Sequence, residues 1–106
     1  MSMPRELKIS AKLIAEALEE NGLDPGVDIQ TITLMEEVGE FAGAYRRATG
    51  RARRTDTMEH AYEELADVVI VAYVIANALE IDLDQEIQKK LDTVFSRGWR
   101  ENVNAS

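Results

Sequence analysis

Two acidic pairs have the residue types and the spacing that suit metal chemistry. Glu37 and Glu40 are three positions apart, and Glu64 and Asp67 repeat that spacing. In a helix, residues three apart lie on one face about one turn from each other, so each pair turns two carboxylates to the same side. Four like charges that converge destabilise a fold unless a cation or protons compensate. The pattern predicts a divalent-metal site; two solvated helix faces are the alternative in a chain with 30% charged residues.

The flanks and the chemistry of these pairs decide which metal is expected. Apolar residues such as Val38 and Val68 adjoin both pairs, which indicates that the carboxylates lie at the edge of a core. All-oxygen ligation favours magnesium or manganese, whereas zinc more often recruits His or Cys. The chain has no cysteine, and we expect its single histidine, His60, at the surface. The residue three positions before it is Thr57, so the Glu-x-x-His pairs of a di-iron bundle are missing.

Apolar residues recur every three or four positions and predict four helices. The first ends at Asn21-Gly22, and the second ends at Gly50, where a glycine is expected after a helix. The third opens at Asp56, which with Glu59 resembles a capping box. The predicted spans are about 7–18, 28–49, 56–79 and 83–97.

The second half of the third segment, residues 65–79, is apolar nearly all round. Its β-branched residues leave a buried strand as an alternative, but its length and its Glu/Ala-rich lead-in favour a helix. Such a helix needs burial on all sides, which a lone four-helix domain rarely provides. We therefore expect an all-α, four-helix bundle completed by self-association. In the second segment, Gly39 costs about 1 kcal/mol of helix stability relative to Ala, and with Gly43 it predicts a close approach by a neighbouring helix or a phosphate.

Length and composition indicate the number of domains, the classes of partner and the location of the chain. The length of 106 residues and the lack of a linker predict a single domain over 1–106. A net charge of −8 repels phosphate backbones and anionic lipid, so neither nucleic acid nor a membrane is an expected partner. No signal peptide or membrane-spanning run is recognisable, and the absence of cysteine fits a reducing cytoplasm.

Two segments of the chain resemble the metal-binding helices of MazG-type nucleoside triphosphate pyrophosphohydrolases: Leu34-Met-Glu-Glu-Val-Gly-Glu-Phe41 and Tyr62-Glu-Glu-Leu-Ala-Asp-Val-Val69. The resemblance covers roughly residues 30–99. It implies an all-α pyrophosphatase fold, related to dimeric dUTPases and phosphoribosyl-ATP pyrophosphohydrolases, that assembles into dimers or tetramers. It also implies magnesium-dependent hydrolysis between the α and β phosphates, which gives a nucleoside monophosphate and pyrophosphate and removes unwanted nucleotides from the cellular pool.

The resemblance further implies roles for single residues. Carried over position by position, the magnesium ligands are Glu37, Glu40, Glu64 and Asp67. Glu36 becomes a candidate to orient or deprotonate the attacking water. Lys90 and Arg97 lie in a segment similar to the family's closing helix, where they would meet phosphates; complementing a helix C-terminus is the alternative. Many relatives have an asparagine where this chain has Val94, so phosphate contacts there differ in detail.

Other functions stay open at this point. The same fold and metal also suit a dUTPase-like or phosphoribosyl-ATP pyrophosphohydrolase activity, and a non-enzymatic helical oligomerisation module would need only the apolar third segment. Basic residues beside the first acidic pair are either a triphosphate clamp or a solvated loop. They are Arg46, Arg47, Arg51, Arg53 and Arg54.

Overall fold

The computed structural model describes residues 10–96, which form four α-helices and no strand. The helices are α1 (Ala11–Glu20), α2 (Val27–Ala48), α3 (Met58–Ala78) and α4 (Leu83–Ser96). The predicted all-α class is confirmed, and the apolar stretch at 65–79 is helical rather than a strand. Within the described residues, no helix is both long and apolar enough to cross a membrane.

A side-chain hydrogen bond explains where α1 begins, and a glycine explains where α2 ends. The Ser10 side chain accepts a hydrogen bond from the backbone N–H of Leu13 at 3.3 Å, which satisfies one open donor at the start of α1. After α2, Gly50 has a φ of 77°, a left-handed conformation that glycine adopts without steric cost. The predicted glycine stop is therefore confirmed.

The start of α3 differs from the prediction by one residue. Thr57, not Asp56, caps the helix, because its side chain accepts from the backbone N–H of His60 at 3.2 Å. Asp56 instead accepts from the N–H of Thr57 at 2.8 Å through one carboxylate oxygen. The capping box predicted between Asp56 and Glu59 is wrong, and this leaves the other oxygen of Asp56 available for side-chain partners.

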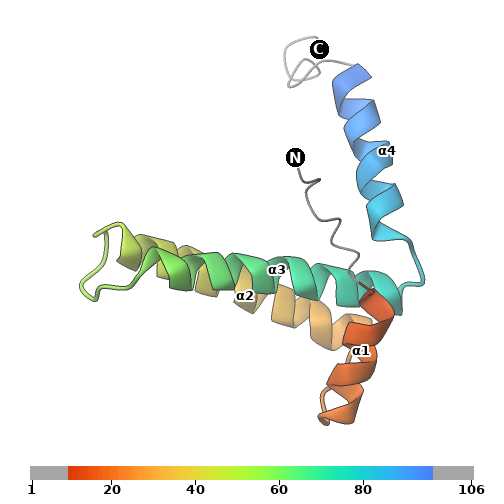
Figure 1. The fold of residues 1–106 in the computed structure, drawn as a ribbon, viewed down its shortest axis with the longest axis horizontal. Coiled ribbons are helices and arrows are strands. Elements are labelled where there is room, and N and C mark those ends of the chain that lie inside the picture. Colours follow the sequence, from red (N-terminus) through yellow and green to blue (C-terminus); the bar gives the residue numbers. More distant parts are fainter. Residues whose placement is uncertain (1–9, 97–106) are drawn as a thin grey trace, which may run out of the picture.

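Helices α2 and α3 run side by side as an antiparallel hairpin, and α1 packs against α3 (Figure 1). Small side chains allow this close approach: Ala44 on α2 and Ala61 and Val74 on α3 are fully buried. The buried Gln30 is satisfied, since its amide nitrogen donates to the carbonyl of Asp24 at 2.8 Å. The hairpin is thus the rigid element that sets residues of α2 against residues of α3.

Helix α4 projects away from the hairpin (Figure 1). The hydroxyl of Tyr73 on α3 donates a short hydrogen bond to the carboxylate of Asp84 in the first turn of α4. An apolar pocket of about 160 Å³ lies where the end of α3 turns toward α4. Its lining residues are Leu34, Ala72, Ile75, Ala76, Leu79, Ile81 and Leu83.

Much apolar surface stays open in the single chain. On α3, Leu65, Val69 and Ile70 are 47%, 44% and 39% exposed, so the complete burial predicted for this helix is not reached within one chain. Ile87 and Leu91 on α4 are exposed as well. Completion of the bundle by further copies stays a prediction.

No helix that the structure describes in this chain approaches Gly39 closely, and the predicted approach by a phosphate or by another copy stays a prediction. A Cβ built at this position would meet no atom within 4 Å among the described residues, and Gly39 is exposed. Gly43 differs, because a Cβ there would lie 3.2 Å from Nη1 of Arg47. Within this chain, Gly43 makes room for a guanidinium group and not for a helix.

Candidate metal centre

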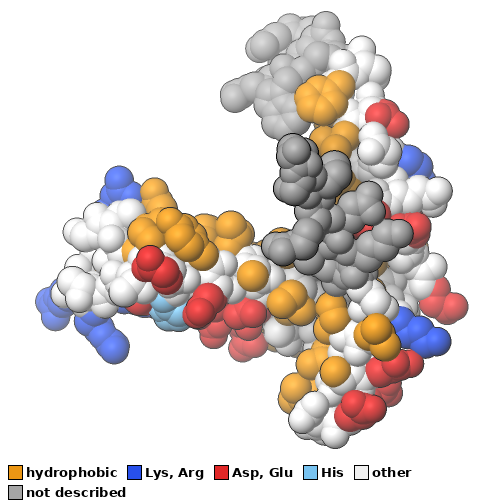
Figure 2. Space-filling view, in the orientation of Figure 1, with side chains coloured by type: hydrophobic (Ala, Val, Ile, Leu, Met, Phe, Trp, Pro, Cys, Tyr) orange, Lys and Arg blue, Asp and Glu red, His pale blue; other side chains and the backbone are white. Residues whose placement is uncertain are grey.

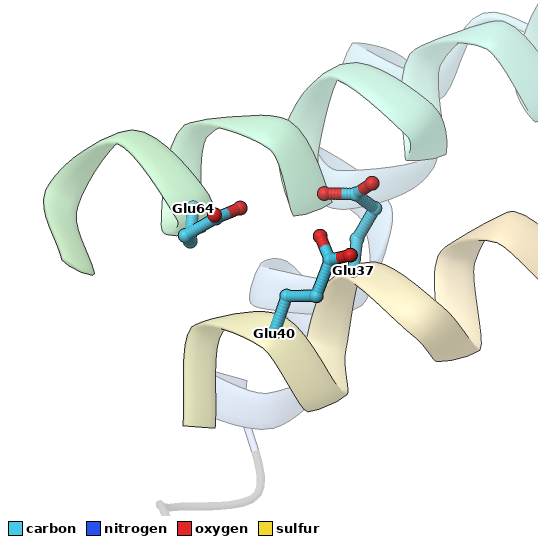
Figure 3. Close-up of side chains that lie close together, drawn as sticks. All are labelled: Glu37, Glu40 and Glu64. Atoms are coloured by element: carbon cyan, nitrogen blue, oxygen red, sulfur yellow. The ribbon is translucent and has the colours of Figure 1, made fainter. Parts of the chain in front are cut away.

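Three carboxylates from the two hairpin helices converge on one point. Glu37 and Glu40 lie one turn apart on α2, and Glu64 lies opposite them on α3 (Figure 3). One carboxylate oxygen from each lies within 4.8 Å of the others. Glu37 and Glu64 are half-buried, whereas Glu40 is exposed and leaves the group open to solvent on one side. This arrangement is one that a divalent cation can bridge from the solvent side.

Glu37 bears the largest electrostatic cost in this group. Its Oε2 atom is buried and has no hydrogen-bond partner among the described residues. Loss of hydration raises the pKa of Glu37, and the charges of Glu40, Asp67, Glu64 and Glu36 raise it further. An unpartnered carboxylate oxygen facing other carboxylates is stabilised by a cation, so the residues present fit a bound metal ion.

Asp67 and Glu36 border the three-residue group without belonging to it. Both charges act on the pKa of Glu37, which places the two carboxylates near the same centre. Asp67 is half-buried on α3, one turn after Glu64, whereas Glu36 is exposed on α2. The structure therefore brings Glu37, Glu40 and Glu64 together, with Asp67 and Glu36 beside them.

His60 lies at the surface as predicted, with a side chain that is 41% exposed, but it also contacts the centre, which was not predicted. Its Nε2 lies 2.9 Å from Oε1 of Glu64, and its Nδ1 lies 2.7 Å from Oδ2 of Asp56. Since both partners are carboxylate oxygens, the two contacts together need an N–H on each ring nitrogen. The spacing Asp56, His60, Glu64 is a four-residue repeat, and this signal was available in the sequence.

The pKa values of this pair move in opposite directions. The hydrogen bond from His60 is the main reason that the pKa of Asp56 falls to about 2, and the backbone N–H of Thr57 adds to it. The hydrogen bond to Asp56 is likewise the main cause that raises the pKa of His60, with a smaller contribution from Glu64. Both shifts favour the charged pair.

Among the described residues, the basic side chains proposed for phosphate binding are not gathered at this centre. Basic side chains collect at the loop end of the hairpin, while acidic side chains follow along it (Figure 2). Arg47 is engaged by Asp56 at 3.2 Å, and Arg46 lies 3.5 Å from the carbonyl oxygen of Arg51. Lys90 is exposed on α4, the helix that projects away from the hairpin. Arg97 lies outside the described residues.

A family model described as the MazG-like family matches residues 31–102, which include all four predicted metal ligands. No curated protein and no solved structure matches the chain significantly.

Proposed function

This chain belongs to the MazG-like family, and from that membership and its acidic centre we propose that it is a metal-dependent nucleotide pyrophosphohydrolase. It cleaves (deoxy)nucleoside triphosphates between the α and β phosphates and releases a nucleoside monophosphate and pyrophosphate. The proposed role is removal of unwanted nucleotides from the cytoplasmic pool. The observation that carries the proposal is the convergence of Glu37, Glu40 and Glu64, with a buried Glu37 oxygen that has no hydrogen-bond partner within residues 10–96.

The donor set favours magnesium, with manganese as a substitute. Every candidate ligand offers oxygen, and hard divalent ions prefer oxygen ligands over the nitrogen and sulfur that zinc recruits. Glu37, Glu40 and Glu64 would hold the ion, and Asp67 would complete the set from α3. A bound ion of this kind neutralises phosphate oxygens and lowers the pKa of a coordinated water.

The chain's own residues would contribute mainly position and charge. Glu36 is exposed next to the centre, where a carboxylate is able to orient or deprotonate an attacking water. Lys90 and Arg97 would meet phosphates. Because α4 projects away from the hairpin, Lys90 would serve the centre of another copy or reach its own after α4 moves. This geometry and the exposed apolar surface support self-association into a dimer or tetramer.

Release of pyrophosphate from a mixture of the standard ribo- and deoxyribonucleoside triphosphates tests the proposal, with magnesium, with manganese and with chelator. We expect release only with metal, and loss of release in Glu40→Gln and Asp67→Asn. The matched control is Glu63→Gln. It removes an exposed charge on α3, the helix of Asp67, outside the group formed by Glu37, Glu40 and Glu64. A double Glu40→Gln, Asp67→Asn variant that remains active would refute the assigned site.

Two other functions have specific readouts. A dUTPase-like enzyme would also cleave dUDP and release orthophosphate. A phosphoribosyl-ATP pyrophosphohydrolase would act on phosphoribosyl-ATP and not on the standard triphosphates. The exposed apolar residues of α3 and α4 favour a second candidate, a non-enzymatic helical assembly module. That candidate requires that saturating magnesium leave the melting temperature unchanged, because an ion that binds only the folded state must stabilise it.

A further inference from the structure

We propose that His60, oriented by Asp56, is a positioning residue that holds the Glu64 carboxylate in place for the metal ion. The inference rests on the proposed metal centre and adds to it two residues that touch neither metal nor substrate. It is carried by a continuous line of side-chain contacts along the first turns of α3.

The line begins at the end of α2 and ends at the centre. Nε of Arg47 lies 3.2 Å from Oδ2 of Asp56, and the same oxygen lies 2.7 Å from Nδ1 of His60. Nε2 of His60 then lies 2.9 Å from Oε1 of Glu64. His60 and Glu64 are four residues apart on one face of α3, and Asp56 precedes the helix cap and contacts His60 from there. On α2, Gly43 lies one turn before Arg47 and leaves room for its guanidinium group.

The burial of the Glu64 side chain indicates that its contact with His60 does more than pair two surface charges. The side chain of Glu64 is only 15% exposed and that of Asp56 only 19%, whereas His60 is 41% exposed. A carboxylate that has lost most of its water needs a fixed partner. A bond from His60 to one oxygen limits rotation of the carboxylate and leaves acceptor capacity on the second oxygen, which a cation can use.

The two ring nitrogens of His60 have different roles. The bond from Nδ1 to Asp56 fixes the plane of the ring, and Asp56 is itself held by Arg47 and by the backbone N–H of Thr57. The ring then presents Nε2 to Glu64 in one direction. Partners that orient metal ligands in this way commonly change metal affinity by about 10- to 100-fold when they are removed.

The test measures binding of Mn²⁺ alone to the full chain, by the electron paramagnetic resonance signal of the unbound ion. We expect His60→Ala to weaken Mn²⁺ binding by about 10- to 100-fold. His60→Gln should recover most of the affinity, because a glutamine amide can donate to Glu64 from a position similar to that of Nε2. Asp56→Ala should weaken binding as well, and adding it to His60→Ala should cause little further loss, since both act through Glu64.

Thr57→Ala separates positioning from simple helix stability. It removes the side-chain cap at His60 N but leaves the side chains of Asp56, His60 and Glu64 in place. We expect this variant to melt at a lower temperature in chelator and to bind Mn²⁺ as the wild type does. Circular dichroism in chelator checks that each variant keeps its helices.

Three results would overturn the inference. If the wild type binds Mn²⁺ and His60→Ala binds it equally well, the positioning role is wrong while the proposed function stands. If His60→Gln and His60→Ala lose affinity equally, the Nε2 donor does not orient Glu64. If the wild type binds no Mn²⁺ and releases no pyrophosphate, the metal centre and the positioning role fail together.

Discussion

Replacing Glu37 by glutamine should stabilise the metal-free protein. In the described part of the chain, Glu37 has a buried oxygen without a hydrogen-bond partner, and its carboxylate lies within 4.8 Å of those of Glu40 and Glu64. Glutamine keeps the size of the side chain, removes the charge and adds an amide that can donate to a neighbouring carboxylate. In the absence of metal, the repulsion within the centre should therefore fall.

The size of the effect follows from the distances. Two unit charges 4.8 Å apart repel by about 1 kcal/mol in water and by about 3 kcal/mol at an effective dielectric constant of about 20. Glu40 is exposed, so its share lies near the lower value, and Glu64 is half-buried. We expect a gain of about 1 to 3 kcal/mol in the free energy of unfolding, which corresponds to a rise of at least about 4 °C in melting temperature for a chain of this size.

The pH dependence gives the sign of this prediction a second check. Because the pKa of Glu37 is raised above 4.5 in the folded state, the folded protein binds its proton more tightly than the unfolded chain does. The contribution of Glu37 to the free energy of unfolding of the metal-free wild type therefore falls as the pH rises from about 4.5 through the folded pKa. The advantage of Glu37→Gln should be small at pH 4 and full at pH 8.

The stability gain and its pH dependence are measured by thermal melting in chelator and in saturating magnesium. The proteins compared are the wild type, Glu37→Gln and the control Glu63→Gln. Magnesium should raise the melting temperature of the wild type and of the control, and have little effect on Glu37→Gln. If Glu37→Gln melts at or below the wild type in chelator at pH 8, the argument from converging like charges is wrong.

Four further predictions concern single residues. Gly39→Ala should raise the free energy of unfolding by about 1 kcal/mol in urea titrations, since open space surrounds the new Cβ; Gly43→Ala should gain less, because the Arg47 guanidinium must shift. Asp56→Asn should be destabilised near neutral pH, and its deficit in urea titrations should shrink as the pH falls from 3.8 through about 2, where the wild type loses the same charge. Tyr73→Phe removes a bond that ties the start of α4 to α3, so hydrogen exchange should become faster in the first turn of α4.

The helices were predictable because their signals are local. The second helix was predicted at about 28–49 and runs from Val27 to Ala48, since apolar periodicity and a glycine stop are both read from adjacent residues. The start of α3 was missed by one residue because Asp56 and Thr57 are both good caps. Which of them accepts the backbone N–H depends on the other partners of Asp56, and these come from α2 and from His60.

Spacing within one helix was enough to put Glu37 and Glu40 on a common face, and the pairing of α2 with α3 brings Glu64 to them. The role of His60 was missed because a histidine beside a helix start is usually solvated. The four-residue spacing of Asp56, His60 and Glu64 was available in the sequence, but the direction of each side chain, which decides whether the contacts form, came only from the structure. The exposure of Gly39 and of the apolar residues on α3 likewise depends on which surfaces the chain leaves uncovered, and periodicity alone does not determine this.

The charge of the centre limits the order of events in the proposed enzyme. Glu37, Glu40 and Glu64 face the position that a triphosphate would approach, and the chain as a whole carries a net charge of −8. A triphosphate is strongly anionic, so the bare centre repels it. Basic side chains gather at the loop end of the hairpin (Figure 2), and one of them, Arg47 at the end of α2, is already engaged by Asp56. If the chain is the enzyme proposed above, we therefore expect metal to enter before the nucleotide or together with it. If His60 positions Glu64 as proposed, metal binding at Glu64 is then a condition for substrate binding as well as for cleavage.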